Sequence, residues 1–274
     1  MKPAGERGRR GIPLRTLIPN AITALALCSG LFAIRYGMAG DWEKAAAAIV
    51  LAAFLDMMDG RIARLLRGQS RFGAELDSLS DVTAFGVAPA VILYLWMLDR
   101  LSSAGASHDY WVRYGWLLAL AHAVCAALRL ARFNAAIDAQ EQPHKSAGFL
   151  TGIPAPAGAG LALLPLFVWL WTGNAAFHEP ALVAPWAALV AFLMVSNLAT
   201  FSWSSLRLRS HVRLGALLTV ALIGGALFTA PWPTLSLAAI LYATMIPFSI
   251  ASYAKVRRQR AAAPRGPDSA GPAA

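Results

Sequence analysis

Four aspartates in one short stretch are the groups in this chain best suited to chemistry. They are Asp56, Asp59, Asp77 and Asp81, in the sequence DMMDGRIARLLRGQSRFGAELDSLSD. The first pair is spaced i, i+3 and the second i, i+4, so each pair shares one face of a helix. Both helices are otherwise apolar enough to lie in a bilayer. Because carboxylates there are costly, they mark a functional site.

The two aspartate pairs are expected to meet just inside a membrane surface. Their helices run in opposite directions, and Asp59 lies about 10 Å before the end of the first at Leu66. Asp77 lies about 6 Å past the start of the second at Gly73. Neighbouring carboxylates cannot all stay ionised without counter-charge. Protonation, as in a proton relay, is one solution; the other is Mg²⁺ or Mn²⁺, of which two ions would balance four aspartates.

The residues around the aspartates favour phosphate chemistry. Gly60 and Ala63 are small and leave room for a ligand on the helix face, and Arg64 offers a multi-donor fork to phosphate. Ser70 and Gly73 flank the loop where a nucleotide could lie. Taken singly, the small residues could instead serve helix packing, and the arginine could be a topology signal.

The composition identifies an integral membrane protein. Of the 274 residues, 58% are hydrophobic and 14% charged, with a net charge of +10 and a mean hydropathy of +0.54. Soluble domains carry roughly 25% charged residues. The basic residues stand between apolar segments, so topology and anionic lipid headgroups account for them, and nucleic acid is not an expected partner.

The chain is expected to be an all-α, polytopic membrane bundle of about eight transmembrane helices. A basic arm over residues 1–14 precedes a core at 15–210, two further helices at 211–253 and a disordered tail at 254–274. The expected spans are Ile18–Tyr36, Trp42–Leu66, Gly73–Leu98, Tyr110–Phe133, Ile153–Trp171, Ala181–Leu198, Leu214–Thr229 and Thr234–Tyr253.

Charge placement predicts the orientation of these spans. All but four of the 24 Lys and Arg residues fall on the side that holds both termini and the loop between the aspartate pairs. The positive-inside rule places that side in the cytoplasm.

The aspartate stretch fits the pattern D-x-x-D-G-x-x-A-R-(x)8-G-x-x-x-D-x-x-x-D without a gap. The chain thereby resembles the CDP-alcohol phosphatidyltransferases, which transfer a phosphatidyl group from a CDP-linked lipid to an alcohol and release CMP. The resemblance implies a six-helix family core, a homodimer, and metal binding by Asp56, Asp59, Asp77 and Asp81, with Asp81 also the general base. It also implies that the CDP-lipid is bound by Gly60, Ala63, Arg64, Ser70 and Gly73, with Asn20 and Thr23 of the PNAIT run.

Four further segments narrow the resemblance to the bacterial integral-membrane phosphatidylserine synthases. They are RFGAELDSLSDVTAFGVAPA, RLARFN, GFLTGIPAPAGAG and MVSNLATFS. This similarity implies CDP-diacylglycerol and L-serine as substrates, within a bacterial inner membrane, and matches Arg132 and Phe133 to the acceptor site. An arginine suits a carboxylate, but Arg132 could also be a topology signal.

Alternatives remain open from the residues alone. The acceptor could be glycerol 3-phosphate, an inositol phosphate or choline. A transporter would also use an acidic cluster inside the membrane, but it gives no reason for Gly60, Ala63 and Arg64 at their spacing.

Overall fold

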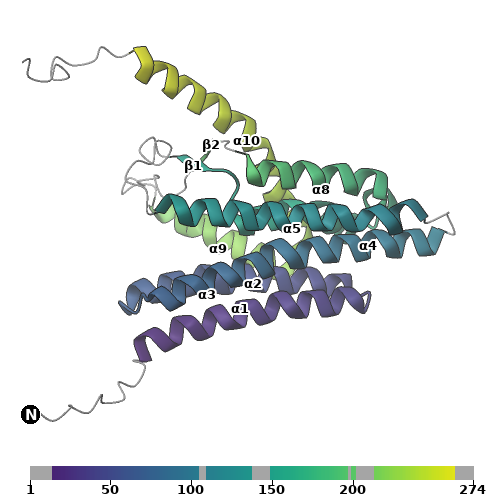
Figure 1. The fold of residues 1–274 in the computed structure, drawn as a ribbon, viewed down its shortest axis with the longest axis horizontal. Helices are drawn as coiled ribbons and strands as arrows, with labels where there is room; N and C mark the ends of the chain where they lie inside the picture. Colours follow the sequence, from purple (N-terminus) through teal and green to yellow (C-terminus); the bar gives the residue numbers. More distant parts are fainter. Residues whose placement is uncertain (1–13, 105–108, 138–148, 197–198, 202–212, 263–274) are drawn as a thin grey trace, which may run out of the picture.

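The computed structural model describes residues 14–104, 109–137, 149–196, 199–201 and 213–262. They form a bundle of long helices with one short strand pair (Figure 1). The predicted basic arm before Leu14 and the chain after Ala262 lie outside the described residues. The elements are α1 (Leu14–Met38), α2 (Trp42–Leu65), α3 (Arg71–Asp81), η1 (Val82–Val87), α4 (Ala88–Ala104), α5 (Asp109–Ile137), β1 (Phe149–Thr151), α6 (Ala155–Ala162), α7 (Leu164–Thr172), η3 (Ala175–His178), α8 (Pro180–Val195), β2 (Ala199–Phe201), α9 (Arg213–Thr229) and α10 (Pro231–Ala262).

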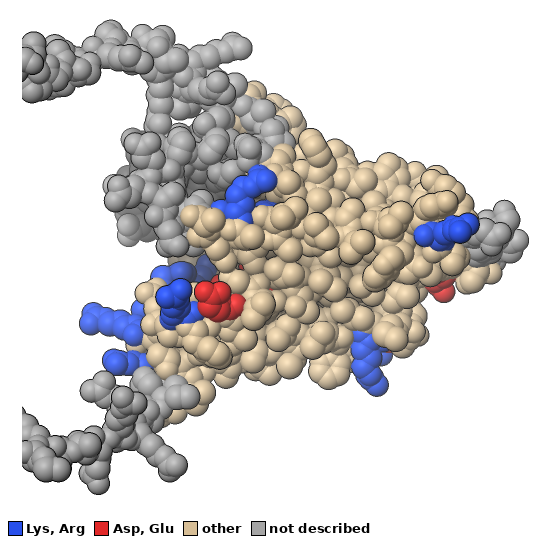
Figure 2. Space-filling view, viewed as in Figure 1, with Lys and Arg blue, Asp and Glu red and all other residues tan. Residues whose placement is uncertain are grey.

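The molecule is a polytopic helical membrane protein, as the sequence predicts. In the described part of the chain, four helical stretches are long and apolar enough to cross a membrane: Leu14–Met38, Arg71–Ser102, Tyr110–Ala135 and Pro231–Ser249. The bent pair α6–α7 gives a fifth. Figure 2 shows charged side chains towards the two ends of the bundle, with an uncharged belt between them.

The expected eight crossings exceed the four or five that pass this test. The difference comes from α2, which carries charged residues near both ends, and from α8 and α9, whose apolar stretches are short. In α2 the extra charges include the aspartates themselves. The residues that carry the chemistry therefore weaken the membrane signal of their own helix.

The predicted third span is a continuous helical rod, α3–η1–α4, whose π-helical turn η1 directly follows Asp81. π-Helical turns occur mostly as short insertions, often at functional sites. This turn is packed tightly on both sides: a Cβ on Gly30 of α1 would lie 2.8 Å from the Ala84 Cα, and one on Gly86 would lie 2.8 Å from the Ala126 Cβ of α5. Glycine permits both approaches, which set the height of Asp81 in the bundle.

The predicted fifth span is broken into α6 and α7, which meet at an angle of 46°. Pro165 has no amide N–H, so the Leu161 carbonyl four residues earlier loses its helical donor. The indole Nε1 of Trp186 in α8 donates to that carbonyl at 2.7 Å. A neighbouring helix thus satisfies the polar group that the proline leaves free.

Two features at the chain's later end were not predicted. β1 and β2 pair antiparallel, with Phe149 opposite Phe201 and Thr151 opposite Ala199, and join the start of α6 to the end of α8. α10 continues to Ala262, so the helix extends past Tyr253 into the predicted disordered tail. The residues there, KVRRQRAA, are mostly good helix formers.

Candidate active site

Three of the four predicted aspartates come together where α2 faces α3. Asp56, Asp59 and Asp77 each offer a carboxylate oxygen within 4.8 Å of the others. Asp81 lies one turn beyond Asp77 on the same helix. Three of the four carboxylates therefore meet across the two helices, while Asp81 is not part of the group of three.

This acidic cluster has little internal compensation. No described Lys, Arg or His forms an ion pair with any of its four carboxylates. Asp59 is only 4% exposed, and the Asp81 Oδ1 atom is buried without a hydrogen-bond partner among the described residues. Oxygen ligands in this number and charge fit a hard divalent cation.

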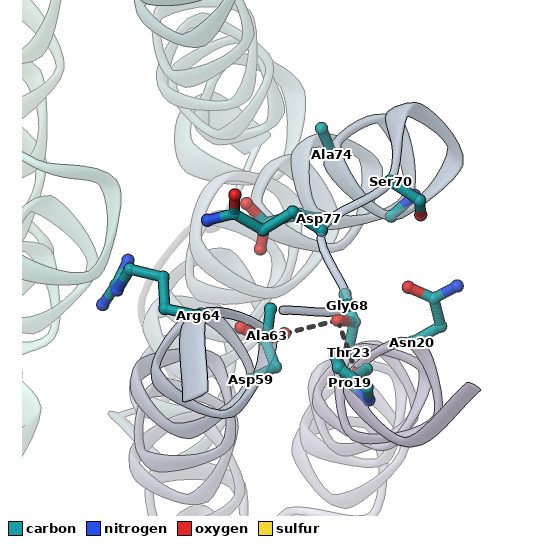
Figure 3. Close-up of a pocket in the computed structure, with 13 residues that line it drawn as sticks. Pro19, Asn20, Thr23, Asp59, Ala63, Arg64, Gly68, Ser70, Ala74 and Asp77 are labelled. Carbon is teal, nitrogen blue, oxygen red and sulfur yellow. Dashed lines mark hydrogen bonds between the residues drawn. The ribbon is translucent and has the colours of Figure 1, made fainter. Parts of the chain in front are cut away.

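α1 holds the cluster from one side through Thr23. The Thr23 hydroxyl lies 2.5 Å from the Asp59 Oδ2 atom and 3.1 Å from the Pro19 carbonyl, so its single proton is shared between two acceptors (Figure 3). Ser80 of α3 donates to the Thr23 carbonyl at 3.3 Å. Sequence reasoning assigned Thr23 to the nucleotide pocket, and the structure shows that it also orients a carboxylate.

The loop between α2 and α3 is fastened to the first turn of α1. Pro19 lacks an N–H, so the Arg15 carbonyl has no donor four residues on. Gly68 packs against this carbonyl so closely that any Cβ would collide with it. At the end of the loop, Ser70 caps α3 by accepting from the Gly73 N–H at 3.0 Å. The loop conformation, and with it the direction of α3, is therefore fixed by contacts to α1.

A cavity of about 270 Å³ opens beside the cluster (Figure 3). Nine of its lining residues were predicted as site residues: Asn20, Thr23, Asp59, Gly60, Ala63, Arg64, Ser70, Gly73 and Asp77. Sequence reasoning missed Pro19, Gly68, Gln69 and Ala74, although all four stand next to, or within two residues of, predicted ones. The small side chains along α2 and α3 make the space, and Arg64 stands at its wall.

Gly73 lies close to two polar side chains at the wall of the cavity. A Cβ there would lie 2.7 Å from the Asn20 Oδ1 atom and 3.1 Å from the Ser70 Oγ atom. A larger residue would therefore displace the Asn20 amide and crowd the Ser70 hydroxyl that caps α3. The predicted positions Asn20, Ser70 and Gly73 thus come together from two helices that are far apart in sequence.

The predicted acceptor residues lie on α5, across from α3. Arg132 is exposed and donates from Nη1 to the Val195 carbonyl at 2.7 Å. Phe133 is 47% exposed, with the guanidinium of Arg129 5.9 Å from its ring centre. Neither lines the cavity described above. Arg129 lies one turn before Arg132 on the same helix.

Comparison of the chain with known proteins identifies its family. The model for CDP-alcohol phosphatidyltransferase matches residues 16–203, and that for CDP-alcohol phosphatidyltransferase 2 matches 211–247. A Mycobacterium tuberculosis protein named CDP-diacylglycerol–serine O-phosphatidyltransferase is 36% identical over 246 residues, 90% of this chain and 82% of its own length. Proteins of the same name from Helicobacter pylori and Bacillus subtilis are each 33% identical, over 66% of this chain and over 70% and 88% of their own lengths. The chain belongs to the CDP-alcohol phosphatidyltransferase family.

Proposed function

We propose that this enzyme transfers the phosphatidyl group of CDP-diacylglycerol to L-serine, giving phosphatidylserine and CMP in phospholipid synthesis. The observation that carries the proposal is the similarity to serine transferases, which extends over 90% of the chain for the mycobacterial relative. The acidic cluster and its neighbouring cavity supply the carboxylates and the space that the reaction needs.

We propose that Asp56, Asp59, Asp77 and Asp81 hold divalent metal, Mg²⁺ or Mn²⁺, as two ions. The number of carboxylates, their burial and the unpartnered Asp81 oxygen support this assignment. Bound metal would neutralise the aspartates and stabilise charge on the phosphates of the substrate. Gly60, Ala63 and Gly73 would give the nucleotide room, while Arg64, Ser70, Asn20 and Thr23 would supply polar contacts to it.

Asp81 is the group we assign to proton removal. A serine hydroxyl is a weak nucleophile at neutral pH and needs a base as it attacks. The new bond forms between the serine oxygen and the phosphorus that carries diacylglycerol. The bond from that phosphorus to the CMP oxygen breaks, CMP leaves, and the hydroxyl proton passes to Asp81. Its buried, unpartnered Oδ1 atom is available for that proton.

The decisive assay uses the purified protein with CDP-diacylglycerol and one acceptor at a time. The acceptors are L-serine, glycerol 3-phosphate, an inositol phosphate and choline, each with Mg²⁺ or Mn²⁺. We expect metal-dependent CMP release and a lipid with the mass of phosphatidylserine with serine alone. A different lipid product would show that another alcohol is the acceptor. CMP release that persists in excess EDTA would contradict the metal assignment.

We further propose that α2, α8 and α9 also cross the membrane, so that eight crossings place both ends of the chain and the α2–α3 loop in the cytoplasm of a bacterial inner membrane. The distribution of Lys and Arg supports this orientation. Single cysteines at Gln69 and Ala39, with Cys28 and Cys125 replaced, test it in intact cells. An impermeant thiol reagent should label position 39 only. Labelling at position 69 would show that the α2–α3 loop faces the outside of the cell. The homodimer implied by the family resemblance stays a prediction.

A further inference from the structure

Two contacts fix how α5 lies against the rod that carries Asp81. Gly86 of η1 meets Ala126 of α5, where an added Cβ would lie 2.8 Å from the Ala126 Cβ. Further along, Asn134 Nδ2 donates to the Ser78 Oγ atom at 2.9 Å. Residue numbers fall by eight from Gly86 to Ser78 and rise by eight from Ala126 to Asn134. The two helices therefore run antiparallel, and each residue of one has a fixed neighbour on the other. The stretch around Asp81 therefore lies opposite residues 129–131 of α5.

Arg129 is the cation that this register brings to the acidic cluster. Its guanidinium interacts electrostatically with the Asp81 carboxylate. The Arg129 Nε atom is buried and has no hydrogen-bond partner in the described part of the chain, and the same holds for the Asp81 Oδ1 atom. The ring of Phe133 lies 5.9 Å from the guanidinium carbon. Arg129 is thus held beside the predicted base with hydrogen-bonding capacity unused.

A serine acceptor is matched by a cation at this position. Its carboxylate would be repelled by an ionised Asp81, yet its hydroxyl must reach that same residue. The two groups of serine are separated by only two carbon atoms, so the carboxylate must bind near the base. An arginine fork is the side chain best matched to a carboxylate. Arg132, the sequence-predicted candidate, is exposed and donates to the end of α8.

We propose that Arg129 binds the carboxylate of the acceptor amino acid next to Asp81. The proposal rests on the proposed function, since it assumes that serine is the acceptor. It makes Arg129 the residue that distinguishes serine from amino alcohols without a carboxylate.

The test compares serine with serinol, in which a hydroxymethyl group replaces the carboxylate. In Arg129→Ala, kcat/KM for serine should fall about 10- to 100-fold, the usual effect of a lost charge-assisted hydrogen bond. The value for serinol and the KM for CDP-diacylglycerol should stay within about twofold, and Arg129→Lys should recover part of the loss. If serinol turns over too slowly to follow, its competitive inhibition constant against serine replaces kcat/KM.

Arg113→Ala, exposed at the other end of α5, controls for loss of a basic residue.

Three results would overturn the proposal while leaving the proposed function intact. Equal losses with serine and serinol in folded Arg129→Ala would make Arg129 structural. If Arg132→Ala no longer distinguishes serine from serinol while Arg129→Ala still does, Arg132 is the acceptor residue, as the sequence predicts. If Arg129→Ala does not fold, an unchanged ratio of the serine and serinol kcat/KM values in Arg129→Lys would also overturn the proposal. A wild-type protein that forms no phosphatidylserine would instead reject the proposed function.

Discussion

The two ends of the bundle treat charge in opposite ways. At the site end, where α2 passes into α3, four carboxylates stand without a described ion-pair partner. At the far end, charges pair with one another: Arg100 binds Glu179 at 2.5 and 3.0 Å, and Lys44 binds Asp41 at 2.7 Å.

This difference separates stability from function. The far end links α4 to the start of α8 and closes the α1–α2 turn with side chains that satisfy each other. The site end keeps charges close together, which opposes folding unless a ligand compensates them. Mutations at the site end should therefore reduce activity without loss of stability, and mutations at the far end should do the reverse.

The largest effect is expected from Asp77→Asn. Loss of one carboxylate from the cluster should lower CMP release by about a thousandfold at saturating Mg²⁺ or Mn²⁺, since metal stabilisation of a transition state is worth several kcal/mol. Thermal unfolding in EDTA should occur at the same temperature or higher, because like-charge repulsion is reduced. Glu75→Gln removes the same charge from an exposed position of α3 and is the control. Near wild-type turnover in Asp77→Asn would reject the metal site.

Asp81→Asn should affect the chemical step more than binding. Loss of a general base typically costs about 10²- to 10⁴-fold, so kcat should fall within that range. Binding of CDP-diacylglycerol, followed by titration with a labelled lipid, should change little in comparison. If binding is abolished and residual kcat stays near wild type, Asp81 is a metal ligand only and the base lies elsewhere.

Removal of the Arg100–Glu179 pair should reverse this pattern. The two side chains are 27% and 46% exposed, so solvent screening limits the coupling energy to about 0.5–1 kcal/mol. A double-mutant cycle with Arg100→Met and Glu179→Gln, read by thermal unfolding in detergent, measures that energy. Turnover per folded molecule should not change. A severalfold loss of kcat in either variant would mean that the two ends are not independent.

The smallest effect concerns His178, which stacks on Trp96 with ring centres 4.1 Å apart and bonds to its carbonyl at 2.7 Å. Burial lowers the pKa of His178, and the nearby Asp99, Arg100 and Glu179 modify it. The folded protein therefore binds this proton less readily than the unfolded chain, where the pKa is about 6.5. Its stabilising contribution is complete above that pH and decreases as the pH falls below it.

His178→Gln tests this dependence without disturbing the site. Between about pH 7 and 5, the wild type should lose more stability than the variant, and the difference isolates the histidine from the aspartates, which titrate in both proteins. Parallel stability curves for the two proteins would show that His178 does not titrate across this range.

The sequence by itself determined the membrane class, the two aspartate pairs and most of the cavity wall. These features are local: the i, i+3 and i, i+4 spacings fix which side chains share a helix face, and the small residues belong to the same two helices. The fold boundaries of α1, α2 and α5 also follow from their apolar runs, to within a few residues.

Only the tertiary structure decided how that pattern is held in place. The Thr23–Asp59 bond joins residues 36 positions apart, and the Asn134–Ser78 bond joins residues 56 apart. The π-helical turn after Asp81 is likewise packed between glycine contacts to α1 and α5. Local periodicity carries no information about such partners, because each is set by how helices distant in sequence pack. The sequence therefore determined which groups do the chemistry, while packing decided which residues orient them.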